Sequence, residues 1–174
     1  MKVTIPYTPR KQQAFIHKEL DKHRFSVLCC HRRFGKTVML INHLIKCCMM
    51  NKNHQPRFAY IAPTYSQAKK IAWDYLKFYT KGLPNTKYNE TELRCDFFNG
   101  SRITLLSSEN PDSIRGIYLD GVVCDEASQI SRELIDEVIR PAIADRKGWM
   151  SLCSTPKGMN NIFYDMYLKA QQEK

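Results

Sequence analysis

The amino-acid sequence predicts an α/β fold with a mostly parallel central sheet flanked by helices. Three observations support this class. Short apolar runs alternate with segments of helical spacing, a Gly-Lys-Thr tripeptide joins the first run to an apolar helix, and a later run ends in Asp125 and Glu126. With 174 residues, the chain has the length of one domain and can bury a substantial core.

The expected sheet is built from apolar runs that are each short enough for a buried strand. These runs are residues 25–30, 57–63, 120–126 and 149–154. A β-hairpin insertion is expected as well, because the pair Asn99-Gly100 separates residues 92–98 from residues 102–107, and Asn-Gly favours a tight turn between antiparallel strands.

Helices are expected at residues 38–50, at 68–79, after Ser131 and at 160–172. Ser131 is a candidate N-cap, and Pro141 is expected to stop or kink the helix that Ser131 begins. The buried face of the second helix is predicted by helical spacing that ends at Gly82. Its members are Ala68, Ile71, Tyr75, Leu76 and Tyr79. Trp73 stays open between core packing and stacking on bases.

The composition favours a polyanionic partner without identifying one. The formal net charge is +10, which suits DNA, RNA or nucleotide phosphates, but a generic lysine-rich surface would give the same value. No segment approaches the roughly 18 uninterrupted apolar residues of a membrane span. The first residues lack the apolar run of a signal peptide, so we expect an intracellular protein.

The seven cysteines are expected to be reduced and mostly buried. Their number is odd, two pairs are adjacent (Cys29–Cys30 and Cys47–Cys48), and the chain has no Cys-x-x-Cys motif. A zinc site is not expected at Cys29, Cys30 and His31, because three contiguous side chains cannot converge on one ion.

The stretch "VLCCHRRFGKTVML", residues 27–40, is similar to a phosphate-binding loop between a strand and a helix. The spacing G-x4-G-K-T requires a glycine where this chain has Cys30. The loop can still work if Cys30 accepts an ordinary backbone conformation, because Gly35 and the following amides cradle the phosphates. Lys36 would then reach the β- and γ-phosphates, and Thr37 would bind Mg²⁺.

Arg32 and Arg33 place positive charge where the phosphates would lie. A Gly-Lys-Thr tripeptide is weak evidence alone, and the alternative is a basic surface turn. The strand before it, the helix after it and the arginines within it favour a nucleotide site.

Asp125 and Glu126 supply the acidic partner of such a loop at the carboxyl end of a buried strand, the edge at which open α/β sheets bind ligands. Asp125 would hold Mg²⁺ beside Thr37, and Glu126 would orient and deprotonate the attacking water. An acidic pair that merely opens a loop is the alternative. Ser154 and Thr155 end a further strand and would lie beside the γ-phosphate.

Arg115 is a candidate arginine finger. It lies in a polar loop, followed by Gly116 as a hinge, and could reach the site of a neighbouring subunit. A surface salt bridge to Asp112 is the alternative, and the pattern alone does not decide between them.

Several stretches in a fixed order carry a resemblance to a known family. They are "YTPRKQQAF", "CHRRFGKT", "YIAPTYSQAKKIAW", "NGSRITLLSSENPDSIRGIYLDGVVCDEAS" and "STPKG". The chain resembles the ATPase part of the large terminase subunit, the motor that pumps DNA into the capsids of tailed phages. A loop that carries arginine in place of its first glycine is typical of these motors.

The resemblance implies roles for individual residues. Gln13 matches the glutamine that reads the adenine edge, with Gln12 as the other register. Arg32 matches the loop arginine proposed to act within its own subunit. Arg115 matches the arginine proposed to act on the ATP of the adjacent subunit, and Thr155, with its neighbour Ser154, matches the motif that couples hydrolysis to movement.

The resemblance also implies a P-loop ATPase fold, ATP and Mg²⁺ as cofactors, and a homo-oligomeric ring, usually a pentamer. Double-stranded DNA would pass through this ring. The expected partners are the capsid portal and the small terminase subunit, and the expected location is the host cytoplasm, docked on the procapsid.

Large terminases continue into a nuclease domain of RNase H type, which needs clustered carboxylates. After "STPKG" only 16 residues follow, with Asp165 and Glu173 as their carboxylates. We therefore expect residues 1–174 to be the ATPase domain, incomplete at its C-terminus and without the nuclease. A helicase-like DNA translocase and a nucleotide-binding DNA or portal adaptor with little turnover are the alternatives.

Overall fold

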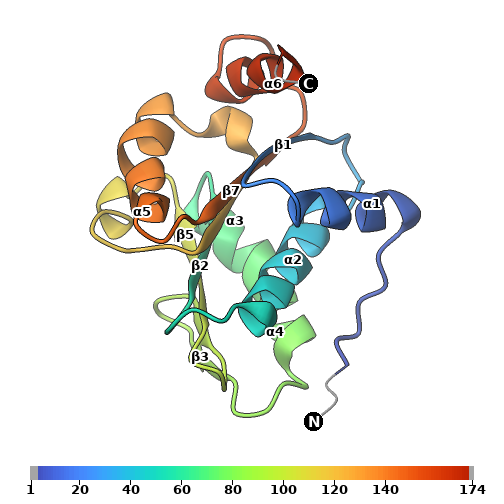
Figure 1. Cartoon of the computed structure of the whole chain (residues 1–174), viewed down its shortest axis with the longest axis vertical. Coiled ribbons are helices and arrows are strands. Elements are labelled where there is room, and N and C mark those ends of the chain that lie inside the picture. Colours follow the sequence, from blue (N-terminus) through green and yellow to red (C-terminus); the bar gives the residue numbers. More distant parts are fainter. Residues whose placement is uncertain (1–3, 173–174) are drawn as a thin grey trace.

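The computed structural model describes residues 4–172, so Glu173 lies outside the described residues. Its centre is one seven-stranded sheet with the strand order β1-β7-β6-β2-β5-β4-β3. The neighbouring strands β1, β7, β6, β2 and β5 pair in parallel, whereas the pairs β5–β4 and β4–β3 are antiparallel. Figure 1 shows α1, α2 and α4 on one side of the sheet and α5 on the other. The predicted α/β class with a mostly parallel sheet is confirmed.

All predicted strands form. Their bounds are β1 Phe25–Cys29, β2 Arg57–Ala62, β6 Gly121–Asp125 and β7 Trp149–Ser154. The predicted hairpin is β4 (Arg94–Asp96) and β5 (Arg102–Ser107), and β5 also pairs with β2, which attaches the hairpin to the sheet. The edge strand β3 (Lys87–Asn89) was not predicted, because three residues are too few for a periodic pattern.

The helices lie between the strands in chain order. Their bounds are α1 Lys11–Leu20, α2 Lys36–Met50, α3 Tyr65–Gln67, α4 Trp73–Thr80, α5 Arg140–Ala144 and α6 Ile162–Gln172. Short 3₁₀ turns occupy Pro111–Ser113 and Ala127–Gln129, and π-helical segments occupy Ala68–Ala72 and Leu134–Ile139. The helix α1 was not predicted, since its sequence shows little apolar periodicity.

Two apolar clusters cover the two faces of the sheet. On one face, residues of α2 and α4 such as Leu40, Leu44 and Leu76 pack on Phe58 and Ile103 of the strands. The other face packs against the segment that leads into α5. This second cluster contains Ile61, Val122, Ile135, Ile139 and Leu152. Burial on both faces explains why the parallel strands read as continuous apolar runs.

The predicted buried face of the helix at 68–79 is partly wrong. Ala68 and Leu76 are buried, but Ile71 and Tyr75 are exposed. The π-helical segment is the reason, because its wider turn shifts the side chains that follow it relative to a regular 3.6-residue helix. Trp73 is buried, and its indole N–H donates to Glu90 at 2.6 Å, so core packing is its role in this structure.

Of the two outcomes expected at Pro141, a stop or a kink of its helix, the stop is wrong. Ser131 caps this helix as predicted, since its hydroxyl accepts from the N–H of Leu134 at 3.2 Å. The helix then continues through Pro141 to Ala144. Pro141 has no N–H to donate to the preceding turn, and the π-helical turns before it change the hydrogen-bonding register at this point.

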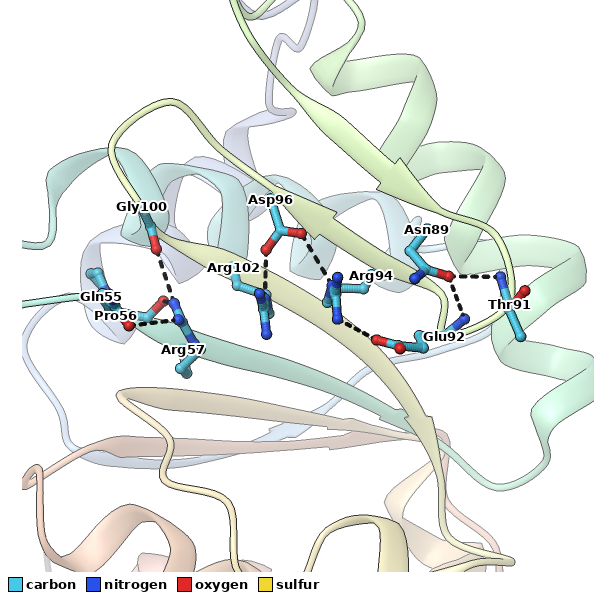
Figure 2. A network of polar contacts seen from close by, with 10 residues as sticks. All are labelled: Gln55, Pro56, Arg57, Asn89, Thr91, Glu92, Arg94, Asp96, Gly100 and Arg102. Atoms are coloured by element: carbon cyan, nitrogen blue, oxygen red, sulfur yellow. Dashed lines mark hydrogen bonds and ion pairs between the residues drawn. The ribbon is translucent and has the colours of Figure 1, made fainter.

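An arginine network ties the hairpin to the rest of the sheet (Figure 2). The Asp96 carboxylate accepts from Arg94 at 3.1 Å and from Arg102 at 2.5 Å. Arg57, at the start of β2, donates to the carbonyl of Gly100 in the hairpin turn at 2.9 Å. These contacts join three neighbouring strands on the sheet face that α2 does not cover.

The seven cysteines are free, and all except Cys29 and the half-buried Cys47 are buried, which confirms that prediction. Among residues 4–172, the structure contains no helix with the length and apolar character needed to cross a membrane.

Candidate nucleotide-binding site

The predicted phosphate loop connects β1 to α2. Cys30 has no positive φ, and its N–H donates to the carbonyl of Ser154 at 3.0 Å, so it continues the parallel ladder of β1 and β7. The Cys30 side chain is buried, and a hydrogen bond from Cys153 lowers the pKa of its thiol. An ordinary backbone conformation therefore replaces the first glycine of the usual spacing without strain.

Gly35 is the glycine that the loop cannot replace. Its φ of +83° lies in the left-handed region, and a Cβ at this position would meet Nε2 of Gln13 at 2.9 Å. The residue is also the N-cap of α2, so the first helix amides and the positive end of the helix dipole face the loop. Arg33, with a φ of +64°, has an exposed side chain and is not among the lining residues of the cleft described below.

Gln13 joins α1 to this loop. Its Nε2 donates to the carbonyls of Phe34 (3.1 Å) and Gly35 (3.4 Å), and its Oε1 accepts from the N–H of Arg10 at 3.0 Å. The side chain is buried, whereas Gln12 lines a cavity of about 630 Å³ beside α1 and the loop. In this conformation the Gln13 amide holds the backbone of the loop.

The Thr37 and Asp125 side chains meet as predicted. The Thr37 hydroxyl donates to Oδ2 of Asp125 at 2.9 Å, which joins the start of α2 to the end of β6. The buried hydroxyl of Tyr60, on β2, donates to the same oxygen at 2.5 Å. Burial and the Asp125 charge raise the pKa of Tyr60 well above its ordinary value, so the phenol stays protonated and remains a donor.

Glu126 forms long ion pairs with two lysines. Lys36 Nζ lies 3.7 Å from Oε1 of Glu126, and Lys157 Nζ lies 3.8 Å from its Oε2. Glu126 adopts a left-handed φ of +50°, and its N–H donates to Oδ1 of Asp125 at 2.9 Å. This unusual backbone turns the Glu126 side chain from the strand end toward the loop.

Most of these side chains line a cleft of about 330 Å³, but Lys36 is not among its lining residues. Its lining residues are Arg32, Thr37, Tyr60, Ala62, Pro63, Gln67, Ile71, Asp125, Glu126, Gln129, Thr155 and Lys157. The predicted residues Arg32, Thr37, Asp125, Glu126 and Thr155 thus share one crevice. The cleft lies at the carboxyl ends of the parallel strands, where open α/β sheets bind ligands.

Ser154 lies behind the cleft. Its hydroxyl is 2.8 Å from the hydroxyl of Ser128 and donates to the carbonyl of Thr155 at 3.0 Å. Ser128 follows Glu126 by two residues, so these hydroxyls connect the end of β7 to the loop that carries the glutamate.

Arg115 lies outside the cleft of its own chain. Its side chain is 58% exposed, and Nε lies 3.6 Å from Oδ1 of Asp112, so the alternative surface salt bridge forms. It lines a second cavity with Gly116, Tyr118 and Glu137. Exposed ion pairs of this kind contribute little, about 0–1 kcal/mol, so this pair leaves Arg115 free to move.

Sequence reasoning missed Tyr60, Gln67, Gln129 and Lys157. Tyr60 lay in an apolar run, and its role depends on the strand order that brings β2 beside β6. Lys157 lies two residues after the predicted coupling residue Thr155, and its positive charge at the end of a predicted strand was the available signal.

The donors in the cleft suit one kind of cation. The described residues, 4–172, contain no group of three or more His, Cys, Asp or Glu side chains that could hold a metal. Thr37 and Asp125 offer one hydroxyl and one carboxylate, and both are hard oxygen donors. Such a pair fits Mg²⁺, which takes its other ligands from water and from the phosphates of its substrate.

Comparisons with known proteins identify the family. The family described as "Terminase large subunit, T4likevirus-type, N-terminal" matches residues 31–174. The chain is 29% identical over 181 residues to the terminase large subunit of Thermus phage G20c, covering 93% of this chain and 36% of that protein. It is also 29% identical over 167 residues to the terminase large subunit of Escherichia phage T5, covering 92% and 37%. The chain thus spans about a third of the length of these curated relatives.

Solved structures show the same fold. The large terminase ATPase domain of Thermus phage P74-26 is 27% identical, with a TM-score of 0.78 over 94% of this chain and 71% of that one. The HK97 bacteriophage large terminase is 16% identical, with a TM-score of 0.76 over 95% and 38%. A large terminase of a thermophilic bacteriophage, solved in complex with ATP-γ-S, is also 16% identical, with a TM-score of 0.75 over 94% and 42%. The family match covers most of the chain, which therefore belongs to the terminase large subunit family and corresponds to its N-terminal part.

Proposed function

We propose that this chain binds ATP with Mg²⁺ and hydrolyses it, and that a ring of its copies uses the hydrolysis to translocate double-stranded DNA during viral genome packaging. One observation carries the proposal: Lys36 Nζ lies 3.7 Å from Oε1 of Glu126, and Glu126 lines the cleft that also holds the Thr37–Asp125 pair. Membership in the terminase large subunit family supports it.

The residues divide the work as follows. Gly35 and the first amides of α2 would cradle the phosphates, and Lys36 would bind the β- and γ-phosphates. Thr37 and Asp125 would hold Mg²⁺, which when bound neutralises charge on the phosphate oxygens. Arg32 lines the same cleft and would stabilise the charge that develops on the γ-phosphate.

Glu126 is the general base of the proposal. It would accept a proton from a water molecule whose oxygen attacks the γ-phosphorus, while the bond from this phosphorus to the β–γ bridging oxygen breaks and leaves ADP and phosphate. General-base assistance contributes about 10²- to 10⁴-fold to a rate. Lys36 at 3.7 Å keeps the Glu126 side chain beside the loop before ATP enters.

The adenine base would lie near α1. The cavity of about 630 Å³ beside the loop has Phe15 and Phe34 among its lining residues, which offer apolar surface to a planar ring. We propose that Gln13 reads the adenine edge after it releases its contacts to Phe34 and Gly35, and Gln12 is the competing residue. Comparing Gln13→Ala with Gln12→Ala for their preference between ATP and GTP tests this assignment.

The remaining parts of the proposal concern assembly. Ser154 and Thr155 would couple hydrolysis to movement through the contact of Ser154 with Ser128. Arg115, exposed and outside the cleft, would act in the site of a neighbouring copy. We propose a homo-oligomeric, pentameric ring that docks on the capsid portal in the host cytoplasm and works with the small terminase subunit.

Phosphate release tests the proposal directly. It is measured with and without double-stranded DNA for wild type, Lys36→Ala, Glu126→Gln and the control Glu133→Gln, which removes an exposed carboxylate close to Glu126 in the chain. We expect Lys36→Ala to lose ATP-γ-S binding, Glu126→Gln to bind ATP-γ-S but turn over about 10²-fold more slowly or worse, and the control to match wild type. A wild type no faster than Glu126→Gln, at concentrations that allow assembly, would instead favour the adaptor function.

A further inference from the structure

Lys157 is a charged cleft residue to which neither the family match nor the proposed mechanism gives a role. It follows β7 by three residues, after Thr155 and Pro156, and its side chain lines the cleft with 40% of its surface exposed. Its Nζ lies 3.8 Å from Oε2 of Glu126. The ammonium group therefore sits on the opposite side of this carboxylate from Lys36, which is 3.7 Å from Oε1.

The two ion pairs contact the Glu126 carboxylate but give it no hydrogen bond. Distances of 3.7 and 3.8 Å exceed the 2.7–3.2 Å or so of an N–H···O hydrogen bond, so both contacts are Coulombic only. The Oε2 atom is buried and, among the described residues, accepts no hydrogen bond. Glu126 thus pairs with two cations, and within residues 4–172 neither cation has an ion pair shorter than these two contacts.

Hydrogen bonds hold the backbone around Lys157 in place beside the cleft. The Asn161 side chain donates to the carbonyls of Lys157 (3.1 Å) and Gly158 (3.2 Å), which closes the loop between β7 and α6. Gly158 has a φ of +69°, which makes this tight return of the chain possible. The loop is therefore held by its own contacts, and only the long flexible side chain of Lys157 has to move to reach a ligand.

We infer that Lys157 is a further catalytic residue that binds the terminal phosphate group of the nucleoside triphosphate. The phosphate offers several charged oxygens to Lys157 and Arg32, which line the cleft, and to Lys36, which lies 3.7 Å from Glu126. These charge-assisted contacts replace the long pairs to Glu126. When the Lys157 ammonium group leaves Oε2 of Glu126 and contacts the phosphate, the Glu126 carboxylate becomes free to bind the attacking water. This inference rests on the proposed function, because it names a contact of the same site.

A diphosphate cannot make this contact, since its last phosphate lies where Lys36 and the loop amides bind. Lys157 therefore distinguishes the triphosphate from the diphosphate, and it does so from the loop that directly follows Thr155. Binding of the terminal phosphate would in this way change the contacts of Lys157, three residues after the end of β7.

Nucleotide binding by the full chain tests the inference, with ATP-γ-S and ADP as probes in separate titrations. The variants are Lys157→Ala, Lys157→Arg and the control Lys52→Ala, which removes one exposed lysine charge beyond the far end of α2. We expect Lys157→Ala to weaken ATP-γ-S binding about tenfold or more while ADP affinity changes less than about threefold. Lys157→Arg should recover most of the loss, and Lys52→Ala should match wild type for both probes.

The outcomes separate this inference from the function on which it rests. Equal losses for ATP-γ-S and ADP, or no loss for either, in a Lys157→Ala protein whose wild type binds both would overturn the role of Lys157 and leave the proposed function intact. A wild type that binds neither probe would overturn the proposed function, and the inference with it.

Discussion

The Tyr60 hydroxyl lies 2.5 Å from Oδ2 of Asp125, although Tyr60 belongs to β2 and Asp125 to the end of β6. The same oxygen accepts from Thr37 at 2.9 Å. One carboxylate oxygen thus joins two strands and the first turn of α2. Its orientation is fixed before any ligand enters the cleft.

Removing the Tyr60 hydroxyl should therefore destabilise the fold. Tyr60→Phe leaves a buried carboxylate with one donor fewer, and we expect the free energy of unfolding to fall by about 1–3 kcal/mol. Urea unfolding followed by circular dichroism measures the change. Tyr75→Phe is the matched control, because Tyr75 is exposed and should change stability by less than about 0.5 kcal/mol. Equal stability of the two variants would show that the short contact to Asp125 does not contribute.

Stability should also depend on pH through His43. Its Nδ1 lies 3.2 Å from Nδ1 of His17, and its Nε2 lies 3.6 Å from the Cys47 thiol. Burial, assisted by the charges of His17 and Lys46, lowers the pKa of His43 from 6.5 to about 4. Between these two values the unfolded chain binds a proton that the folded chain does not, so stability is complete above pH 6.5 and is lost as the pH falls toward 4.

The expected loss from His43 between pH 6.5 and pH 5 is about 2 kcal/mol, from 1.36 kcal/mol per pH unit. Urea unfolding at pH 7, 6 and 5 measures it. In His43→Gln most of this pH dependence should disappear, whereas His54→Gln, at an exposed position, should keep it. A His43→Gln protein with the pH profile of wild type would refute the assignment.

Arg115 gives a prediction that separates action within a subunit from action between subunits. We expect Arg115→Ala to bind ATP-γ-S as wild type does and to lose phosphate release. The Glu126→Gln variant should also be inactive, but it keeps its arginine. Mixing the two inactive variants should restore part of the activity if Arg115 acts on a neighbour, because some sites then combine an intact Glu126 with an arginine from the adjacent copy.

No recovery on mixing, together with an equal loss of activity in dilute Arg115→Ala that does not assemble, would place Arg115 in its own site. The pair to Asp112 supplies a control, because Asp112→Asn removes that salt bridge but keeps the arginine. Its phosphate release should remain close to that of wild type.

Any side chain at Gly121 should disturb the packing at the start of β6. A Cβ at this position would lie 2.2 Å from Cε2 of the Trp149 indole, on the neighbouring strand β7. Gly121→Ala should lower the free energy of unfolding by about 1–3 kcal/mol, because the ring has to move out of a well-packed position. Gly82→Ala is the control, since a Cβ there meets nothing within 4 Å and the φ of Gly82 is not positive. Equal denaturation midpoints for the two variants would contradict the close approach of the ring.

The strands and the cleft were predictable because their signals are local. In the run at 120–126, residues 121–124 are apolar because the strand is buried on both faces, and the acidic pair at its end indicates the edge of the sheet that binds ligands. The contact between Lys36 and Glu126 then follows from the rule that parallel strands present their carboxyl ends together.

Other features depended on information that no short segment carries. The exposed positions of Ile71 and Tyr75 result from a π-helical segment, which has no simple sequence signature. The role of Tyr60 requires the strand order, in which β2 neighbours β6 although β3, β4 and β5 separate them along the chain. The buried amide of Gln13 depends on how α1 docks against the loop, which periodicity within α1 did not reveal.

The place of β7 between β1 and β6 has a mechanical consequence. Its backbone is hydrogen-bonded along both edges, so sliding this strand would break two ladders at once. We therefore expect β7 to stay in place within the sheet. A movement of Thr155 would be transmitted along residues 155–161 instead. This segment leads into α6, which packs beside β1 and the turn after Glu126. We therefore expect α6 to be the element that moves when Thr155 is displaced.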